Sequence, residues 1–251
     1  MGLLSTVRSW FALERNARPV ALRARYDAAQ TTTDNSNHWA YADALGAATA
    51  NSEGVRQKLR TRARYERANN CFANGMIRTV ANHVVGAGPR LQIQTENEEV
   101  NQQIEDEWER WARRIGLADK LRTMRMAKCY DGEAFAMLVS NPNINVDVTL
   151  DVRLVECDQI TGQYRTNTPR HIDGIEFDRY GNPITYYLLD QHPGDSLAFA
   201  RSFETRPIDA ESMIHWFRRD RPGQVRGIPE ITPALPLYAV LRRYTLAVLH
   251  S

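Results

Sequence analysis

Cysteine is scarce in this sequence, and the patterns that would make a metal site or a disulfide framework from it are missing. The 251 residues include three cysteines, which are odd in number and widely spaced: Cys71, Cys129 and Cys157. Because the sequence holds no Cys-x-x-Cys pair and no His/Cys spacing typical of zinc ligands, we expect reduced, buried thiols.

Long apolar runs are also missing. No run reaches the roughly 18 residues that a membrane-spanning helix needs. Arg8, Glu14 and Arg15 interrupt the short apolar patch at the N-terminus, so we expect no signal peptide, no membrane partner and a soluble intracellular product.

A large excess of either charge is the next feature that is lacking. The chain has 32 basic and 30 acidic residues and a net charge of +2, with 43% hydrophobic residues. This composition is typical of a globular protein with one large or two small domains. Attraction to nucleic acid would have to come from local clusters of basic residues.

Catalytic motifs are absent as well. The histidines show no His-Glu-x-x-His spacing, and there is no Gly-x-Ser-x-Gly. The segment 86–88 ends a predicted helix and is not followed by Gly-Lys-Ser/Thr, so it is not a phosphate-binding loop. We predict no catalytic residue, no metal ligand, no cofactor and no enzymatic activity, and we interpret His83 as a core histidine.

Two carboxylate pairs keep one alternative open. Asp131 and Glu133 are two residues apart, and so are Glu156 and Asp158. Such pairs bind divalent metals in nucleases, so a metal-dependent nucleic-acid enzyme is the alternative. We favour structural roles, because Gly132 and Asp158 mark turns.

Helical periodicity covers much of residues 53–130, and the preceding residues have little to bury. We expect a short amphipathic helix in 1–20 and an arm over 18–51 that orders against another subunit. The helix after Ser52 is the most basic segment, with the residues Arg56, Lys58, Arg60, Arg62, Arg64 and Arg67. We interpret it as a solvated face, the alternative being a separate nucleic-acid-binding module over 54–67.

Three further helices are expected, over 72–85, over 96–114 and from Leu117 to the turn at Asp131. The predicted apolar face of the first of them comprises Phe72, Met76, Ile77, Val80, His83 and Val84, with Ala73 and Ala81 at close-packing positions.

Strand-like alternation follows, from Glu133 to Val139, over 144–190 with a hairpin at 175–189, and from Ile208 to Phe217. The segment from Pro233 onward is apolar on all sides, so we expect a helix that needs a partner and continues beyond this chain. The fold class is α+β: N-terminal helices pack with a β-rich middle, and the start of a long helix follows.

Between the last strand and that helix lies a basic, turn-forming loop. Residues 214–229 read IHWFRRDRPGQVRGIP, in which four arginines precede or follow a Pro-Gly turn: Arg218, Arg219, Arg221 and Arg226. Together with Arg60 and Arg64, they are the candidates for contact with DNA or another subunit.

The amino-acid sequence of this loop resembles that of the portal proteins of tailed phages, lambda type. Three further runs resemble the same family and occur in the same order: NNCFANGMIRTVANHVVGAGPRLQI at 69–93, DGEAF at 131–135 and GIEFDRYGNPITYYL at 174–188.

The resemblance implies a portal-like fold and the N-terminal part of a structural subunit. Such subunits form a ring, usually of twelve copies, at one vertex of the virion. The ring is a channel for double-stranded DNA, and it binds the terminase large subunit, the head–tail connector and capsid proteins. Family members extend beyond the point reached here, so we expect a fragment. We divide the chain into an N-terminal helix and arm (1–52), a helical part (53–143), a β-rich region (144–217) and the basic loop with the start of the long helix (218–251).

Overall fold

The computed structural model describes residues 32–162, 170–195 and 204–250. The chain divides into two compact units, Met1–Ala44 and Leu45–Ser251. In the first unit the described residues include consecutive turns over 33–41, where Thr32 and Asn35 exchange hydrogen bonds. The predicted helix within 1–20 lies outside the described residues. The four-part division of the chain stays a prediction.

The second unit begins with four main helices. After the short α2 (Ala47–Ala50) come α3 (Glu53–Asn69), α4 (Cys71–Val85), α5 (Glu98–Arg114) and α6 (Leu117–Tyr130). Their positions agree with the predicted helices. Asn70 and Asn97 cap α4 and α5 by accepting two backbone N–H bonds each, as asparagine does at helix N-termini. Ser52 makes no such side-chain bond.

Two antiparallel sheets follow. Sheet A has the order β2-β1-β7 and sheet B the order β3-β4-β5-β6. The strands are β1 (Glu133–Ser140), β2 (Leu150–Val155), β3 (His171–Ile172), β4 (Ile175–Phe177), β5 (Pro183–Leu189), β6 (Thr205–Asp209) and β7 (Met213–Phe217). A 3-10 turn and loop occupy the segment up to Thr149, where the sequence predicted strand from residue 144.

The predicted single strand over 208–217 is wrong in one respect. A 3-10 turn (Ala210–Ser212) breaks it, so that β6 pairs with β5 in sheet B and β7 pairs with β1 in sheet A. This turn links the two sheets. The predicted hairpin is confirmed as β4 and β5, joined through Asp178, whose carboxylate accepts the backbone N–H groups of Tyr180 and Asn182.

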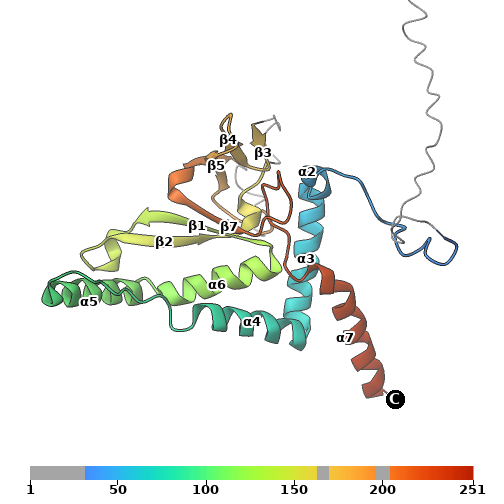
Figure 1. Ribbon diagram of the computed structural model, residues 1–251, viewed down its shortest axis with the longest axis horizontal. Coiled ribbons are helices and arrows are strands. Elements are labelled where there is room, and N and C mark those ends of the chain that lie inside the picture. Colours follow the sequence, from blue (N-terminus) through green and yellow to red (C-terminus); the bar gives the residue numbers. More distant parts are fainter. Residues whose placement is uncertain (1–31, 163–169, 196–203, 251) are drawn as a thin grey trace, which may run out of the picture. The chain divides into compact units, whose positions relative to one another are not determined.

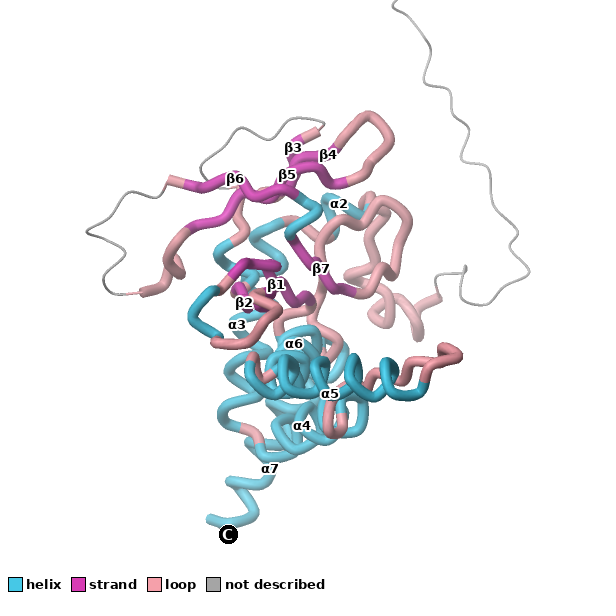
Figure 2. The backbone as a smooth tube through the Cα atoms, turned by 90° about the vertical axis from the view of Figure 1, so that its left-hand side faces the viewer, coloured by secondary structure: helices cyan, strands magenta, loops and turns pink. Residues whose placement is uncertain are grey.

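The unit is layered, as Figures 1 and 2 show, with sheet B on one face of sheet A and α5 and α6 on the other. Phe135, Tyr186 and Leu188 belong to the core between the sheets. Trp111 and Met124 belong to the core beneath sheet A. A third cluster joins α3, α4 and α6 to the start of α7 (Leu235–His250).

The prediction for helix α4 is confirmed for Ile77 and for the close-packing positions Ala73 and Ala81, and it is wrong for its largest side chains. Its buried face is Ala73, Ile77 and Ala81, whereas Phe72 is 60% exposed. His83 is exposed, so the interpretation as a core histidine is wrong. Small residues let α4 approach α3 and α6 closely. Close packing of the helices therefore decides which face of α4 is buried, and its largest side chains stay exposed.

None of the helices in the described part of the chain has the length and apolar character needed to cross a membrane.

Candidate functional site

The loop that follows β7, residues 218–228, is called the basic loop below. Gln224 holds it from within, because its side chain is buried and makes four hydrogen bonds to the loop's own backbone. The side-chain oxygen Oε1 of Gln224 accepts hydrogen bonds from the backbone N–H groups of Asp220 and Arg221. Its amide donates to the carbonyl oxygens of Arg218 and Arg226. The loop is therefore an ordered structure with arginines placed at fixed points.

Arg226 anchors this loop in the interior. Its guanidinium is 2% exposed and binds both carboxylate oxygens of Glu133, whose side chain is fully buried, at 2.7 and 2.9 Å. The same guanidinium donates to the carbonyl oxygens of Ile160 and Cys157, at 3.1 and 3.2 Å. Two-point binding of this kind fixes orientation as well as distance.

Two glycines, Gly132 and Gly227, allow the backbone of the basic loop to lie directly against the start of β1. Gly132, at φ +90°, touches the backbone of Ile228 and Pro229 so closely that a Cβ would overlap both. A Cβ on Gly227 would overlap the carbonyl group of Gly132. The Asp-Gly-Glu and Arg-Gly-Ile-Pro runs are therefore two halves of one contact, in which Glu133 also accepts the N–H of Gly227 at 3.0 Å.

Helix α3 brings three arginines to the same region at four-residue spacing. Arg56, Arg60 and Arg64, called the arginine ladder below, lie on one face of the helix. Arg56 pairs with Asp173 at 3.0 Å, and Arg60 pairs with Asp158 at 3.1 Å.

Arg64, the third member of the ladder, bridges Asp131 and Asp158 at 2.6 Å each. The ladder thus ties α3 to both sheets.

Burial and ion pairing shift the pKa values of several of these side chains. Burial alone would raise the pKa of Glu133, but Arg226 and His215 outweigh it and hold that pKa well below its usual range. Burial raises the pKa of Asp131 to about 6 in spite of Arg64, partly because Asp158 lies nearby. Burial lowers the pKa of His215, against the pull of Glu133 at 3.2 Å, so His215 is a neutral ring at neutral pH.

The six predicted contact residues fall into two groups. Arg218, Arg219 and Arg221 are exposed on the basic loop. Arg218 forms a two-point pair with Asp220, Arg219 lies over the ring of Phe217, and Arg221 donates to the carbonyl oxygen of Leu45.

Arg60, Arg64 and Arg226 form the second group, and they are used inside the subunit. Arg60 and Arg226 are 5% and 2% exposed, so neither guanidinium is available at the surface of this chain. Arg64 is about a third exposed, but its carboxylate partners all lie in the same chain. The interpretation of α3 as a solvated basic face is therefore wrong for the ladder. For the alternative of a nucleic-acid-binding module over 54–67, three of the basic side chains are already paired with carboxylates of the same chain.

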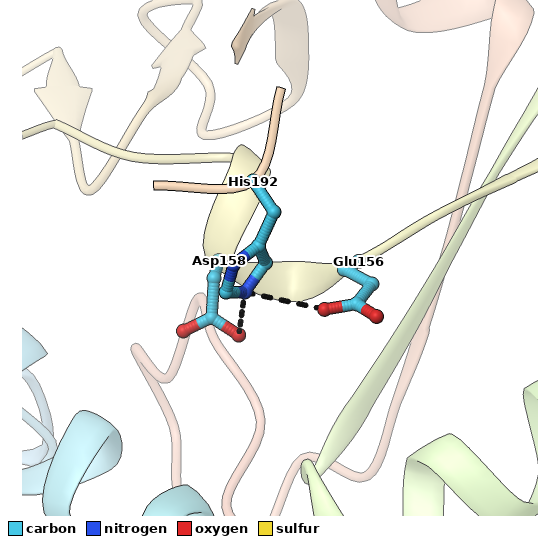
Figure 3. A group of neighbouring side chains, drawn as sticks. All are labelled: Glu156, Asp158 and His192. Carbon is cyan, nitrogen blue, oxygen red and sulfur yellow. Dashed lines mark ion pairs between the residues drawn. The ribbon is translucent and has the colours of Figure 1, made fainter. Parts of the chain in front are cut away.

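All four members of the predicted carboxylate pairs have partners inside the subunit. Asp131, Glu133 and Asp158 bind arginines, as the preferred interpretation expected. Glu156 and Asp158 also meet His192, which the sequence did not single out (Figure 3). The possible ligand atoms of these three residues lie within 4.8 Å of one another.

The hydrogen bonds of this group do not suit a metal. The N–H of Gly194 donates to Nδ1 of His192 at 3.0 Å, which places the ring proton of a neutral His192 on Nε2, 3.2 Å from Glu156. A histidine that binds metal through Nε2 instead needs its proton on Nδ1. The carboxylate of Asp158 is also paired with Arg64. The group is best described as two carboxylates that lie against the ring of His192 and the guanidinium of Arg64.

Comparison with known proteins gives this geometry a context. Residues 34–251 match the family described as phage portal protein, lambda family. The chain belongs to this family. A probable portal protein from Halomonas phage phiHAP-1 is 26% identical over 254 aligned positions, which cover 90% of this chain and 48% of that relative. The chain thus spans about half the length of the curated relative it matches.

The portal family is a structural one, and its match agrees with the resemblance found in the sequence. In this portal-family chain, sequence reasoning found the basic loop but missed its partners. It gave Glu133 no cation and did not notice Gln224. One signal was available: a charged residue beside glycine in each of the two runs, at Glu133 and at Arg226. It did not reveal that the two runs touch.

Proposed function

We propose that the chain forms part of a subunit of a phage portal ring, at the vertex of the virion where DNA enters and leaves. The match to the portal family over residues 34–251 carries this proposal. The ring has about twelve copies, the number that is usual in the family that the sequence resembles. The subunit assembles in the host cytoplasm, docks the terminase large subunit during packaging and then binds head–tail connector and capsid proteins.

The charge distribution supports a passive role in this ring. The arginine ladder and Arg226 have their carboxylate partners inside the subunit. A channel that neutralised many phosphates would bind DNA tightly and slow its passage, because each neutralised phosphate adds affinity. Cations that are paired inside the subunit cannot bind the phosphates of passing DNA, which suits a conduit for double-stranded DNA.

The exposed arginines of the basic loop are the proposed contacts to DNA or to the neighbouring subunit. The test is the triple charge reversal R218E/R219E/R221E, compared with R62E/R78E/R153E, which reverses three exposed arginines elsewhere. Ring formation is followed by particle mass and electron microscopy, and DNA packaging by nuclease protection. We expect the first variant to lose assembly or packaging and the second to keep both.

The two outcomes separate the two contacts. Loss of rings identifies a contact between subunits, whereas intact rings with impaired, salt-sensitive packaging identify a contact with DNA. Normal assembly and packaging in the first variant would remove the basic loop from the proposal. A monomer under all conditions, with the longer relative also monomeric, would remove the ring itself.

A further inference from the structure

The edge of sheet A at β7 is open within the described part of the chain. In the order β2-β1-β7, β7 pairs with β1 on one side, and no described strand pairs with its other side. Apart from the pairing with β1 and the bond that the N–H of Met213 donates to the carbonyl oxygen of Ala210, no described group makes a backbone hydrogen bond to residues 213–217. An open edge of this kind is a template for a further strand.

A groove lies beside this edge. It has a volume of about 740 Å³ and lies between the β4–β5 hairpin, one face of β7 and the basic loop. Its wall includes four aromatic rings, those of Phe177, Tyr186, His215 and Phe217. The ring of His215 stacks on those of Phe135 and Phe217, at centroid distances of 4.2 and 4.4 Å. The groove is therefore the point at which the core between the two sheets opens to the surface.

The rim of the groove is cationic. Arg179, Arg219 and Arg221 line it, and none of the three has an ion-pair partner among the described residues. The two acidic side chains of the rim are already used: Asp220 binds Arg218, and Asp178 accepts the hydrogen bonds of its own turn. The groove therefore offers free positive charge around an apolar floor.

We propose that this groove and the β7 edge receive an extended, acidic segment of a partner protein, which adds a strand to sheet A. Its backbone pairs with β7, one apolar side chain fills the groove, and its carboxylates meet Arg219 and Arg221. Main-chain pairing supplies affinity and the alternate side chains supply specificity in this mode of recognition. Double-stranded DNA has phosphates for the arginines but no peptide groups for the strand edge, so the open edge favours a polypeptide. The inference does not depend on assembly into a ring.

The first test uses a synthetic probe of about eight residues, a common strand length. Glutamates alternate with valines around one central phenylalanine, and binding to the full chain is followed by fluorescence anisotropy. A second peptide with the same side chains carries N-methyl groups on alternate amides, which removes the donors of one edge. We expect the methylated peptide to bind at least about tenfold more weakly. Equal binding of the two peptides overturns strand addition.

The second test uses matched protein variants. R219Q/R221Q removes two of the three free charges, and we expect it to weaken peptide binding about tenfold, the effect of two rim contacts. R62Q/R78Q removes two exposed arginines outside the groove and should change binding less than about twofold. Identical effects of the two variants would show that the peptide senses only net charge, and the site would be withdrawn.

Two further readouts separate the remaining outcomes. Hydrogen exchange of residues 213–217 should slow on binding of the unmethylated peptide, and no protection there overturns the proposal. A duplex oligonucleotide that displaces the peptide and is itself weakened by R219Q/R221Q would assign the groove to DNA. Failure of the peptide tests leaves ring formation untouched, since particle mass measures that separately.

Discussion

Nη2 of Arg226 lies 2.7 Å from Oε1 of Glu133, and the two residues stand 93 positions apart in the chain. This pair joins the basic loop to the first residue of β1, in a position where neither side chain reaches solvent. A buried, two-point pair of this kind is costly to break, because the partner that remains keeps its charge without compensation.

R226M should therefore lower the free energy of unfolding by about 3–5 kcal/mol, the usual cost of leaving one member of a buried pair. Urea denaturation followed by circular dichroism measures it. The double variant E133L/R226M removes the stranded carboxylate and should recover part of the loss. R218Q breaks an exposed pair with Asp220 and should cost no more than about 1 kcal/mol. Equal losses in R226M and R218Q would show that the interior pair is not special.

A second prediction concerns Gly132, where a Cβ would overlap the backbone of Ile228 and Pro229 and where φ is +90°. G132A should cost at least about 2–3 kcal/mol, because it adds backbone strain to steric overlap. Gly75 is the control: it lies in the interior of α4 with no atom near its missing Cβ. G75A should stabilise the chain by up to about 1 kcal/mol. Thermal unfolding midpoints of the two variants should move in opposite directions.

The third prediction is a pH dependence that comes from His215. Burial lowers the pKa of this ring in the folded chain. As the pH falls below about 6.5, the unfolded chain takes up the proton first, so the folded state loses relative stability. H215F fits the stack between Phe135 and Phe217 and removes the titration. We expect the wild type to lose more stability between pH 7 and pH 5 than H215F does, measured by urea titration at each pH.

Asp131 acts in the opposite direction, and the comparison removes its effect. Burial raises its pKa to about 6, so the folded chain takes up this proton before the unfolded chain does. Stability from this source rises as the pH falls from about 6 toward the unfolded value near 4. Both chains keep Asp131, so the difference between them reports His215. Parallel pH curves for the two chains would contradict the assignment.

The sequence predicted local structure well where one physical signal was strong. The periodic spacing of apolar residues located α5 and α6, and the Gly-Asn turn located the β4–β5 hairpin. It failed at residues 210–212, because alternation reads the same on both sides of a short turn and cannot show that β6 and β7 belong to different sheets.

Charged residues were the hardest to place from sequence. Arg56 and Arg60 look like a solvated helix face, since burying arginine requires partners that lie about 100 residues away in the chain, such as Asp158. The same holds for Arg226, which shares its loop with three exposed arginines. Its burial depends on the close approach of Gly132 and Gly227, a tertiary contact that no local pattern encodes.

The last prediction concerns the exposed apolar face of α7. The first half of this helix contacts the rest of the unit: Leu235 is buried, and Arg242 pairs with Glu66 at 2.8 Å. Leu237 and Leu249 are 70% and 76% exposed, and Tyr244 is 66% exposed. Apolar patches of this kind on a soluble surface mark interaction sites or cause aggregation.

L237Q/Y244Q/L249Q should therefore bind less of a hydrophobic dye and self-associate less, while its urea midpoint stays near that of the wild type. L235A, at the buried start of the same helix, should cost about 2–5 kcal/mol. Light scattering and dye fluorescence measure the first pair of effects, and denaturation measures the second. If the triple variant unfolded as easily as L235A, the outer face of α7 would pack against its own chain. The outer face of α7 would then belong to the core of the subunit and would not be free to bind another chain.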